Sequence, residues 1–558
     1  MYKFTIIFLC LISVISPCML EAQDILGGKL SGNFQLDAQY YQKDTLIGAG
    51  DVSEKMLSNG FLNINYTAGN FSAGLRYEEY LNPLLGIDTR YRGTGIGYRF
   101  ASFNSEIIEV TVGNFYEQFG SGMIFRAYED RALGFDNSVD GLRFKLHPIK
   151  GVDITGLIGN QRNFWDKGKG IVRGGSMTLN LNSLIEDFFP NDYQFLLEGS
   201  IMSRYQADNQ STFYFPENVF AESARLNISG SEFSFETEYA EKNNDPSAPN
   251  KYNFNKGRGL LANLSYFPEG LGITLNFHTI DNMDFRSDRD AVGNILNLNF
   301  IPPLTKQHIF RLATLYPYAT HLVGEIGIQA EVIYTMPKEW FGDKYGANIS
   351  ANFSQVNSIN KTTKEKDPVS GQIYTYNSEM FNFGDVLYFR DMNVEFTKKW
   401  SPEFKSILSY INLTYNKDVL ENEGSGKYGM VKASIVAGEF TYQINRKNAI
   451  RAELQHIWSK QDSVLHVPNT SNGNWAFFLL EYTIAPNWFI SAFDEYNYGN
   501  EYDDYKIHYL SASATYIHGT TRIAFGYGRQ RGGILCVGGV CRPVPASNGF
   551  LLTISSSF

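Results

Sequence analysis

One short stretch of the chain gathers opposite charges beside glycine and aromatic residues. Residues 113–144 read GNFYEQFGSGMIFRAYEDRALGFDNSVDGLRF, and Gly120 and Gly122 permit a sharp chain reversal there. The charged and aromatic residues that follow are Arg126, Tyr128, Glu129, Asp130 and Arg131. Both arginines can pair with the carboxylates. Two interpretations stay open: a loop folded into a pore that it narrows with opposed charges, or an external loop held by ordinary ion pairs.

The histidines offer no comparable chemistry. The eight of them, at positions 147, 278, 308, 321, 456, 466, 508 and 518, lack metal-ligand spacing. Only His456, on the same face as Leu454 and Trp458 of an alternating stretch, resembles the position that a lipase would need at a membrane rim. An aromatic belt at the membrane interface explains it better. We therefore expect no catalytic residue, no metal and no cofactor, and predict that the protein is not an enzyme.

The N-terminus reads as a secretory signal peptide over residues 1–22. Lys3 precedes a short apolar run, and small Ala22 stands before polar Gln23, which predicts cleavage between these two residues. The run is short for an uncleaved membrane anchor. A lipoprotein signal ending at Cys18 is disfavoured by Pro17, which occupies the place of a small residue.

The two cysteines that remain after cleavage lie close together. Cys536 and Cys541 stand in CVGGVC, and in an exported chain such a pair predicts a disulfide. No histidine or further cysteine lies near enough to complete a metal site.

Composition argues against two further classes, nucleic-acid-binding proteins and helical membrane proteins. The net charge of −10, from 48 basic and 58 acidic residues, argues against nucleic acid as a partner. After the signal peptide no stretch reaches the roughly 20 apolar residues of a transmembrane helix. The chain is nevertheless rich in aromatic residues, which make up 15% of it.

The elements that must position these residues are strands. Apolar and polar residues alternate with a period of two along most of the chain, and helical spacing is rare. One example places Leu75 and Tyr77 on one face, and Arg76 and Glu78 on the other. The closing GFLLTISSSF has the same pattern.

Connections between these strands alternate between short and long, which distinguishes a membrane barrel from a soluble sandwich. Tight turns such as 518–520 and 485–487 alternate with long polar links such as 460–474. Outer-membrane barrels have short periplasmic turns and long extracellular loops. We predict an all-β protein: one large transmembrane antiparallel β-barrel over residues 23–558, in the outer membrane of a Gram-negative cell. The strand number is about 26, within 24–28, if Asn294–Ile301 and Ile309–Tyr318 form a hairpin of the barrel.

The alternation assigns charges to the lumen and apolar residues to lipid and lipopolysaccharide. The charges predicted to face the lumen are Arg76, Glu78, Arg143, Lys145, Glu236 and Glu238. The alternating end Phe550, Leu552, Ile554 and Phe558 resembles the C-terminal signature by which the barrel-assembly machinery recognises its substrates. The Cys536–Cys541 hairpin falls in the last external loop, where it would stiffen a surface tip or offer a receptor-like contact.

Three segments carry a family resemblance. FYEQFGSGMIFRAYEDRALGFDN at 115–137, SGNFQLDAQYYQKD near the N-terminus and YLNPLLG at 80–86 resemble an uncharacterised, porin-like outer-membrane barrel family of Bacteroidota. The resemblance covers the mature chain. It implies the fold and the location, but no catalytic residue and no substrate.

The expected function follows from the width of the barrel. About 26 strands enclose a lumen roughly 50 Å across, too wide for strand side chains alone to fill. We predict a porin-like channel or uptake pore for small solutes. The alternative is a structural or assembly component of an envelope complex that binds partner proteins. A plugged, energy-coupled transporter is disfavoured, because strands begin soon after the signal peptide, without room for a plug domain.

Overall fold

The computed structural model describes residues 23–25, 27–185, 188–190, 192–208, 214–341, 344–422, 426, 428–462, 471–537 and 540–558. The predicted signal peptide and its cleavage after Ala22 lie outside the described residues. Within these ranges, no helix has the length and apolar character needed to cross a membrane.

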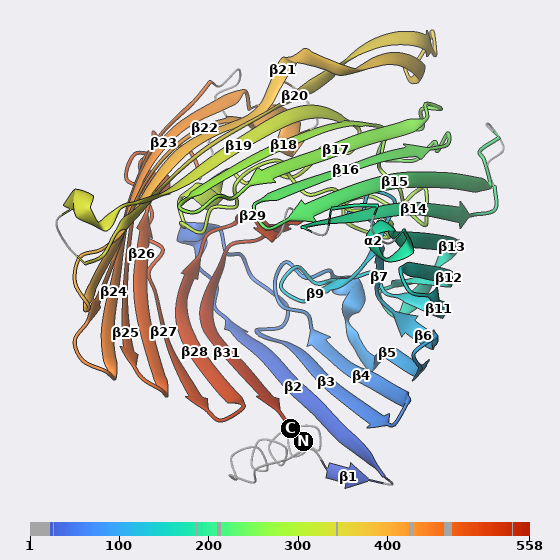
Figure 1. Cartoon of the computed structure of the whole chain (residues 1–558). Coiled ribbons are helices and arrows are strands. Elements are labelled where there is room, and N and C mark those ends of the chain that lie inside the picture. The colour runs from blue at the N-terminus through green and yellow to red at the C-terminus, as the bar shows by residue number, and fades with distance from the viewer. Residues whose placement is uncertain are drawn as a thin grey trace.

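The described residues form one large antiparallel sheet that closes on itself (Figure 1). The sheet has 25 strands, and all but β1 (Gln23–Ile25), which pairs only with β2, belong to the barrel, leaving 24. The barrel strands are β2 (Gly28–Tyr41), β3 (Met56–Ala68), β4 (Phe71–Asn82), β5 (Gly93–Asn104), β6 (Ile108–Phe115), β11 (Val139–Ile149), β12 (Val152–Asn163), β13 (Asp166–Asn180), β14 (Tyr193–Tyr205), β15 (Asn218–Gly230), β16 (Phe233–Lys242), β17 (Gly257–Tyr266), β18 (Leu271–Asp281), β19 (Gly324–Met336), β20 (Ala347–Lys366), β21 (Ile373–Lys399), β22 (Phe404–Asn416), β23 (Met430–Gln443), β24 (Asn448–Gln461), β25 (Trp475–Ile484), β26 (Trp488–Tyr496), β27 (Ser511–His518), β28 (Thr521–Gln530) and β31 (Ser547–Ser557).

Short elements lie outside this sheet. The strands are β7 (Glu117–Phe119), β8 (Phe125–Ala127), β9 (Glu129–Asp130), β10 (Phe135–Asp136), β29 (Gly533–Val537) and β30 (Val540–Val544). The helices are α2 (Leu181–Leu184) and α3 (Lys417–Asn422), with 3-10 turns η1 (Thr45–Ile47), η2 (Thr89–Tyr91), η3 (Ala313–Leu315), η4 (Lys338–Phe341) and η5 (Asp503–Tyr505).

Closure joins the two ends of the chain. Strand β31 pairs with β28 on one side and with β2 on the other. Every barrel strand thus has two neighbours, as a sheet in lipid requires. The predicted single antiparallel barrel is confirmed, and its 24 strands lie at the lower end of the predicted range.

The two faces of the wall differ as the period of two predicts. On β24, Leu454 and Trp458 are about half exposed on the outside, whereas Glu453 and Gln455 are buried on the lumen side. The outer face therefore offers apolar side chains to lipid. At one rim the connections are short. At the other, β20 and β21 extend as a hairpin well beyond the neighbouring strands (Figure 1). An exception at the long-loop rim is the turn between β12 and β13, where only Phe164 and Trp165 separate the strands.

Two long connections fold into the barrel instead of projecting outward. The first inner segment, residues 116–138, joins β6 to β11, and the second, residues 282–323, joins β18 to β19. Residues 294–301 and 309–318 of the second segment form no barrel strands, so the predicted extra hairpin is wrong. Their alternating apolar residues pack against the inner wall, not against lipid.

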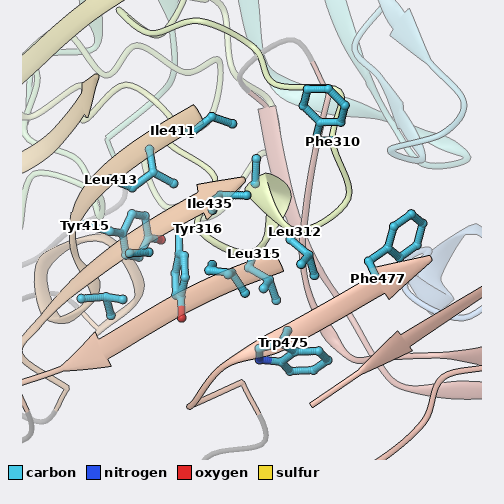
Figure 2. Packing of buried hydrophobic residues seen from close by; sticks show 14 of the residues in the cluster. Phe310, Leu312, Leu315, Tyr316, Ile411, Leu413, Tyr415, Ile435, Trp475 and Phe477 are labelled. Atoms are coloured by element: carbon cyan, nitrogen blue, oxygen red, sulfur yellow. The ribbon is translucent and has the colours of Figure 1, made fainter. Parts of the chain in front are cut away.

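Two apolar clusters fix these segments to the wall. Phe119 and Phe125 of the first segment pack with Leu298 of the second and with Met202 and Val219 of the wall. Further along the second segment, a larger cluster forms against β22 to β25 (Figure 2). Its labelled members are Phe310, Leu312, Leu315, Tyr316, Ile411, Leu413, Tyr415, Ile435, Trp475 and Phe477. The lumen thus contains a packed core built from loop and wall.

Candidate functional site: the occupied lumen

A buried ion network ties the first inner segment to the wall. Arg76 of β4 contacts Glu78 on its own strand at 2.7 Å, and both Glu129 (2.9 Å) and Asp136 on the inner segment. Arg162 of β12 contacts the same Glu78 at 2.6 Å and Asp136 at 2.8 Å. The side chains of Arg76, Glu78 and Arg162 are at most 5% exposed. Two guanidinium groups therefore bridge two wall strands to the segment.

The network favours the charged form of Asp136. Burial alone would raise the pKa of Asp136, but Arg162 and Arg76 outweigh it and hold that pKa below its usual range. Because these groups are removed from water, the loss of one partner leaves the other charges poorly compensated. The network can thus hold the segment in one position.

The other predicted constriction residues lie on the same segment but pair differently. Arg131 contacts Glu129 at 2.8 Å, as predicted, and also donates to Gln35 of β2. Arg126 instead lies over the rings of Tyr128 and Phe300, at 4.3 and 4.4 Å from their centroids. Burial raises the pKa of Tyr128 to about 12, so its hydroxyl stays protonated at neutral pH.

The carboxylate oxygen of Asp130 stays within its own turn. It accepts a hydrogen bond from the backbone N–H of Leu133 at 3.0 Å. Asp130 thus shapes the loop from within, while Arg131 and the stacked Arg126 connect it to β2 and to the second inner segment.

The glycine reversal is held by two wall carboxylates. Gly120 donates its backbone N–H to Glu198 of β14, and Ser121 donates to Glu238 of β16, each at 2.7 Å. Gly120 has a φ of +53°, and a Cβ on it would lie 2.6 Å from the Glu238 carboxylate. Only glycine allows this approach.

The remaining predicted lumen charges fall into two groups on the wall. Arg143 contacts Glu109 and, at 3.3 Å, Glu117, which also binds Lys145 at 2.8 Å. Glu117 belongs to β7, so this group contacts the first inner segment as well.

Elsewhere on the lumen wall single arginines are outnumbered by carboxylates. Arg225 contacts Glu198 and the predicted Glu236, at 3.3 and 3.1 Å. Arg451 of β24 is surrounded by three glutamates, one from each of β23, β24 and β25: Glu439, Glu453 and Glu481. These clusters carry excess negative charge.

A cavity of about 510 Å³ remains beside the second inner segment. Tyr316 of that segment and Phe477 of β25 contribute aromatic walls, and Arg311, Arg451 and Arg531 contribute charge. Sequence reasoning missed this site, because it treated residues 309–318 as membrane strand. The Pro302-Pro303 pair in the middle of the segment was the available signal against that assignment.

The predicted disulfide joins Cys536 to Cys541 across β29 and β30. The hairpin is not a free tip. Arg542 donates to the backbone oxygen of Ala132 at 2.9 Å, and Asn294 donates to the backbone oxygen of Cys541 at 2.6 Å. It therefore contacts both inner segments and covers the lumen.

The predicted assembly signal lies at the seam of the barrel. Phe550 packs on the rings of Phe525 and Tyr527 on the outside. Leu552 and Ile554 follow on β31 opposite β2. Phe558 exchanges two backbone hydrogen bonds with Gly32, both 2.9 Å.

Two features bear on other chemistry. His456 faces the hydroxyl of Tyr498 at 2.6 Å and the ring of Trp458, an aromatic setting without a serine partner in the described contacts. In the described part of the chain, no group of three or more histidine, cysteine or acidic residues is placed to hold a metal ion.

Solved structures with similar folds are outer-membrane barrels. The P pilus usher PapC translocation pore matches with a TM-score of 0.44 and 9% identity, over 94% of this chain and 98% of that one. The siderophore receptor PirA from Pseudomonas aeruginosa matches with a TM-score of 0.40 and 8% identity, over 95% and 80%. OpdK from Pseudomonas aeruginosa, solved with vanillate, matches with a TM-score of 0.34 and 10% identity, over 78% and 94%.

No curated protein matches the sequence. The closed barrel and its apolar outer face place the protein in the outer membrane. A family profile matches residues 1–558 over their whole length. The chain therefore belongs to DUF6029, a family of unknown function.

Proposed function

We propose that this barrel is an outer-membrane channel or uptake pore for small solutes, narrowed by its own two inner segments. The observation that carries the proposal is the arrangement in the lumen. Twenty-four strands enclose a space about 48 Å across between backbones. The two segments pack against the inner wall, and a charged cavity of about 510 Å³ lies beside the second of them.

Constriction by internal loops distinguishes a selective pore from a large hole. The residues that form it in this proposal are Arg126, Tyr128, Glu129, Asp130 and Arg131. Lumen charges on the wall then set the preference for ions. The glutamates around Arg225 and Arg451 outnumber these arginines, so the two clusters favour cations over anions.

Conductance in planar lipid bilayers tests the proposal. The purified protein should give steady conductance steps. Replacing residues 124–136 by a short glycine linker should enlarge those steps, because the constriction is removed while the barrel strands stay intact. Protein that inserts but shows no conductance in either form would refute the channel.

A structural or assembly role is the second candidate, and the protruding β20–β21 hairpin favours it. Val369 and Phe381 on this hairpin are 94% and 70% exposed. Exposed apolar residues beyond the membrane suit contact with another envelope protein. This role predicts a complex that co-purifies from outer membranes at fixed stoichiometry and is electrically silent. The complex should be lost when residues 360–382, which include both side chains, are removed.

A further inference from the structure

Strand β29 presents an unpaired backbone edge. It pairs with β30 and, among the described residues, has no backbone hydrogen bond to any other strand. The Cα atoms of Cys536 and Cys541 are 4.1 Å apart, the short spacing of a pair that does not exchange hydrogen bonds. Ile534, two residues earlier, is in the same phase and lies opposite Pro543, which has no N–H. The backbone groups of Ile534 and Cys536 therefore point away from β30.

That edge faces the 510 Å³ cavity. Residues 533–536 of β29 line the cavity, whereas β30 contributes only Val544. Cys541, Arg542 and Pro543 of β30 line a separate cavity of about 320 Å³ on the other side of the hairpin. A free strand edge can bind an extended peptide backbone by adding it as a further strand.

Charge is unevenly distributed around the cavity. At one end Arg311 and Arg531 each donate their Nε–H to Glu495, which is fully buried. Two arginines share one carboxylate, so one positive charge remains there.

The opposite holds at Arg451, where three glutamates surround one arginine. Lys306 and His308, which also line the cavity, face Glu331 and Asp391. The cavity therefore has a cationic end and an anionic end.

Strand register gives the distance between these ends. Glu495 lies opposite Phe477, which lies opposite Gln455, and Glu453 is two residues from Gln455 along β24. Two strand spacings and two residues separate Glu453 from Glu495, about 12 Å between backbones. An extended chain advances about 3.3–3.6 Å per residue. The spacing fits the opposite charges of a peptide of about three residues.

We propose that this cavity binds a short, extended, zwitterionic peptide. Its backbone pairs with Ile534 and Cys536, its carboxylate lies toward Arg311 and Arg531, and its amino group lies toward Glu453. The inference deepens the proposed channel by naming its solute class.

Titration calorimetry of the detergent-solubilised full chain with trialanine tests the proposal. Trialanine should bind at least about tenfold more tightly than N-acetyl-trialanine amide, which lacks both terminal charges. N-methylation of its central residue should weaken binding about tenfold, because the peptide loses an N–H that would donate a hydrogen bond to a backbone oxygen of β29. This second comparison leaves the protein unchanged, so misfolding cannot mimic it.

Variants locate the binding site. Arg531→Gln and Glu453→Gln should each weaken trialanine binding about tenfold. They should leave the binding of the capped peptide unchanged. Ile534→Pro should weaken the binding of both peptides, because it removes a backbone N–H from the edge. Ile534→Ala keeps that N–H and should leave the binding of both unchanged. Equal affinity for free, capped and methylated peptides would overturn the proposal.

The channel itself is tested separately by swelling of liposomes in arabinose. Swelling in arabinose without trialanine binding would overturn the peptide site and leave the channel standing. Trialanine binding without arabinose swelling or conductance would refute the channel and retain the site.

Discussion

The substitution Asp136→Asn tests whether the ion network holds the first inner segment. Asp136 is 7% exposed and contacts both Arg76 and Arg162. The substitution keeps the shape of the side chain and removes its charge. Arg162 then keeps only Glu78 among its carboxylate partners, and Arg76 keeps Glu78 and Glu129.

The magnitude follows from burial. Breaking a buried ion pair by removing one partner costs about 3–5 kcal/mol. The barrel strands do not depend on Asp136 for pairing, so this cost weakens the docking of the segment, not the barrel. At about 1.4 kcal/mol per factor of ten, the undocked fraction should rise by roughly two to three and a half powers of ten.

Thiol modification measures that fraction. Leu133 lies on the same segment and is 6% exposed, so a cysteine placed there by Leu133→Cys is protected while the segment is docked. Its rate of reaction with a charged, water-soluble thiol reagent should rise by the same factor in the Asp136→Asn background. Melting of the barrel should change little.

A matched control uses an exposed ion pair. Asp88 and Arg90 form a pair at 2.7 Å whose side chains are 35% and 55% exposed. Such pairs contribute about 0–1 kcal/mol, so Asp88→Asn should leave the rate within a few-fold of the parent. Equal rates for the two variants would show that the network does not control docking.

Three further predictions concern pH, the disulfide and the C-terminus. Because the folded pKa of Asp136 lies below its unfolded value of about 3.9, its contribution is complete above that value and is lost as pH falls through the folded pKa; conductance should therefore match at about pH 7 and pH 5 and become noisy near pH 3. Replacing both cysteines by Cys536→Ser and Cys541→Ser removes a cross-link between residues five apart, worth about 2 kcal/mol; hydrogen exchange at 533–544 should speed up about 30-fold, with barrel melting unchanged. Deleting Phe558 removes two backbone hydrogen bonds to Gly32; the heat-modifiable folded band from outer membranes should diminish, whereas Ser557→Ala should leave it intact.

Strand pattern predicts the wall of the barrel well, because lipid on one side enforces alternation. Leu75 and Arg76 could be assigned to opposite faces from their spacing alone. The pattern does not distinguish lipid from an apolar cover inside the lumen. Residues 309–318 therefore resembled membrane strand, although they pack against β22 to β25.

The sequence of the wall strands also indicated that apolar loop residues cover part of the wall from the inside. On β22, Leu408 and Tyr410 face outward, yet Ile411 and Leu413 on the lumen side are also apolar. A strand that is apolar on both faces is covered on both. The ion network was harder to predict from the sequence. Its Glu78–Arg162 contact spans 84 residues and depends on the register of every strand between them.

The pairing of β2 with β31 sets the order in which this protein can fold. Most other contacts in the wall join strands that are neighbours in the sequence, and those hairpins can form locally as each pair becomes available. The final pairing must wait until Phe558, which follows the last barrel strand, reaches Gly32 in the first. Until that moment β2 has an open edge that could pair with another chain. The nascent sheet must therefore be shielded from its own copies throughout synthesis and export, and released only once the ends have met.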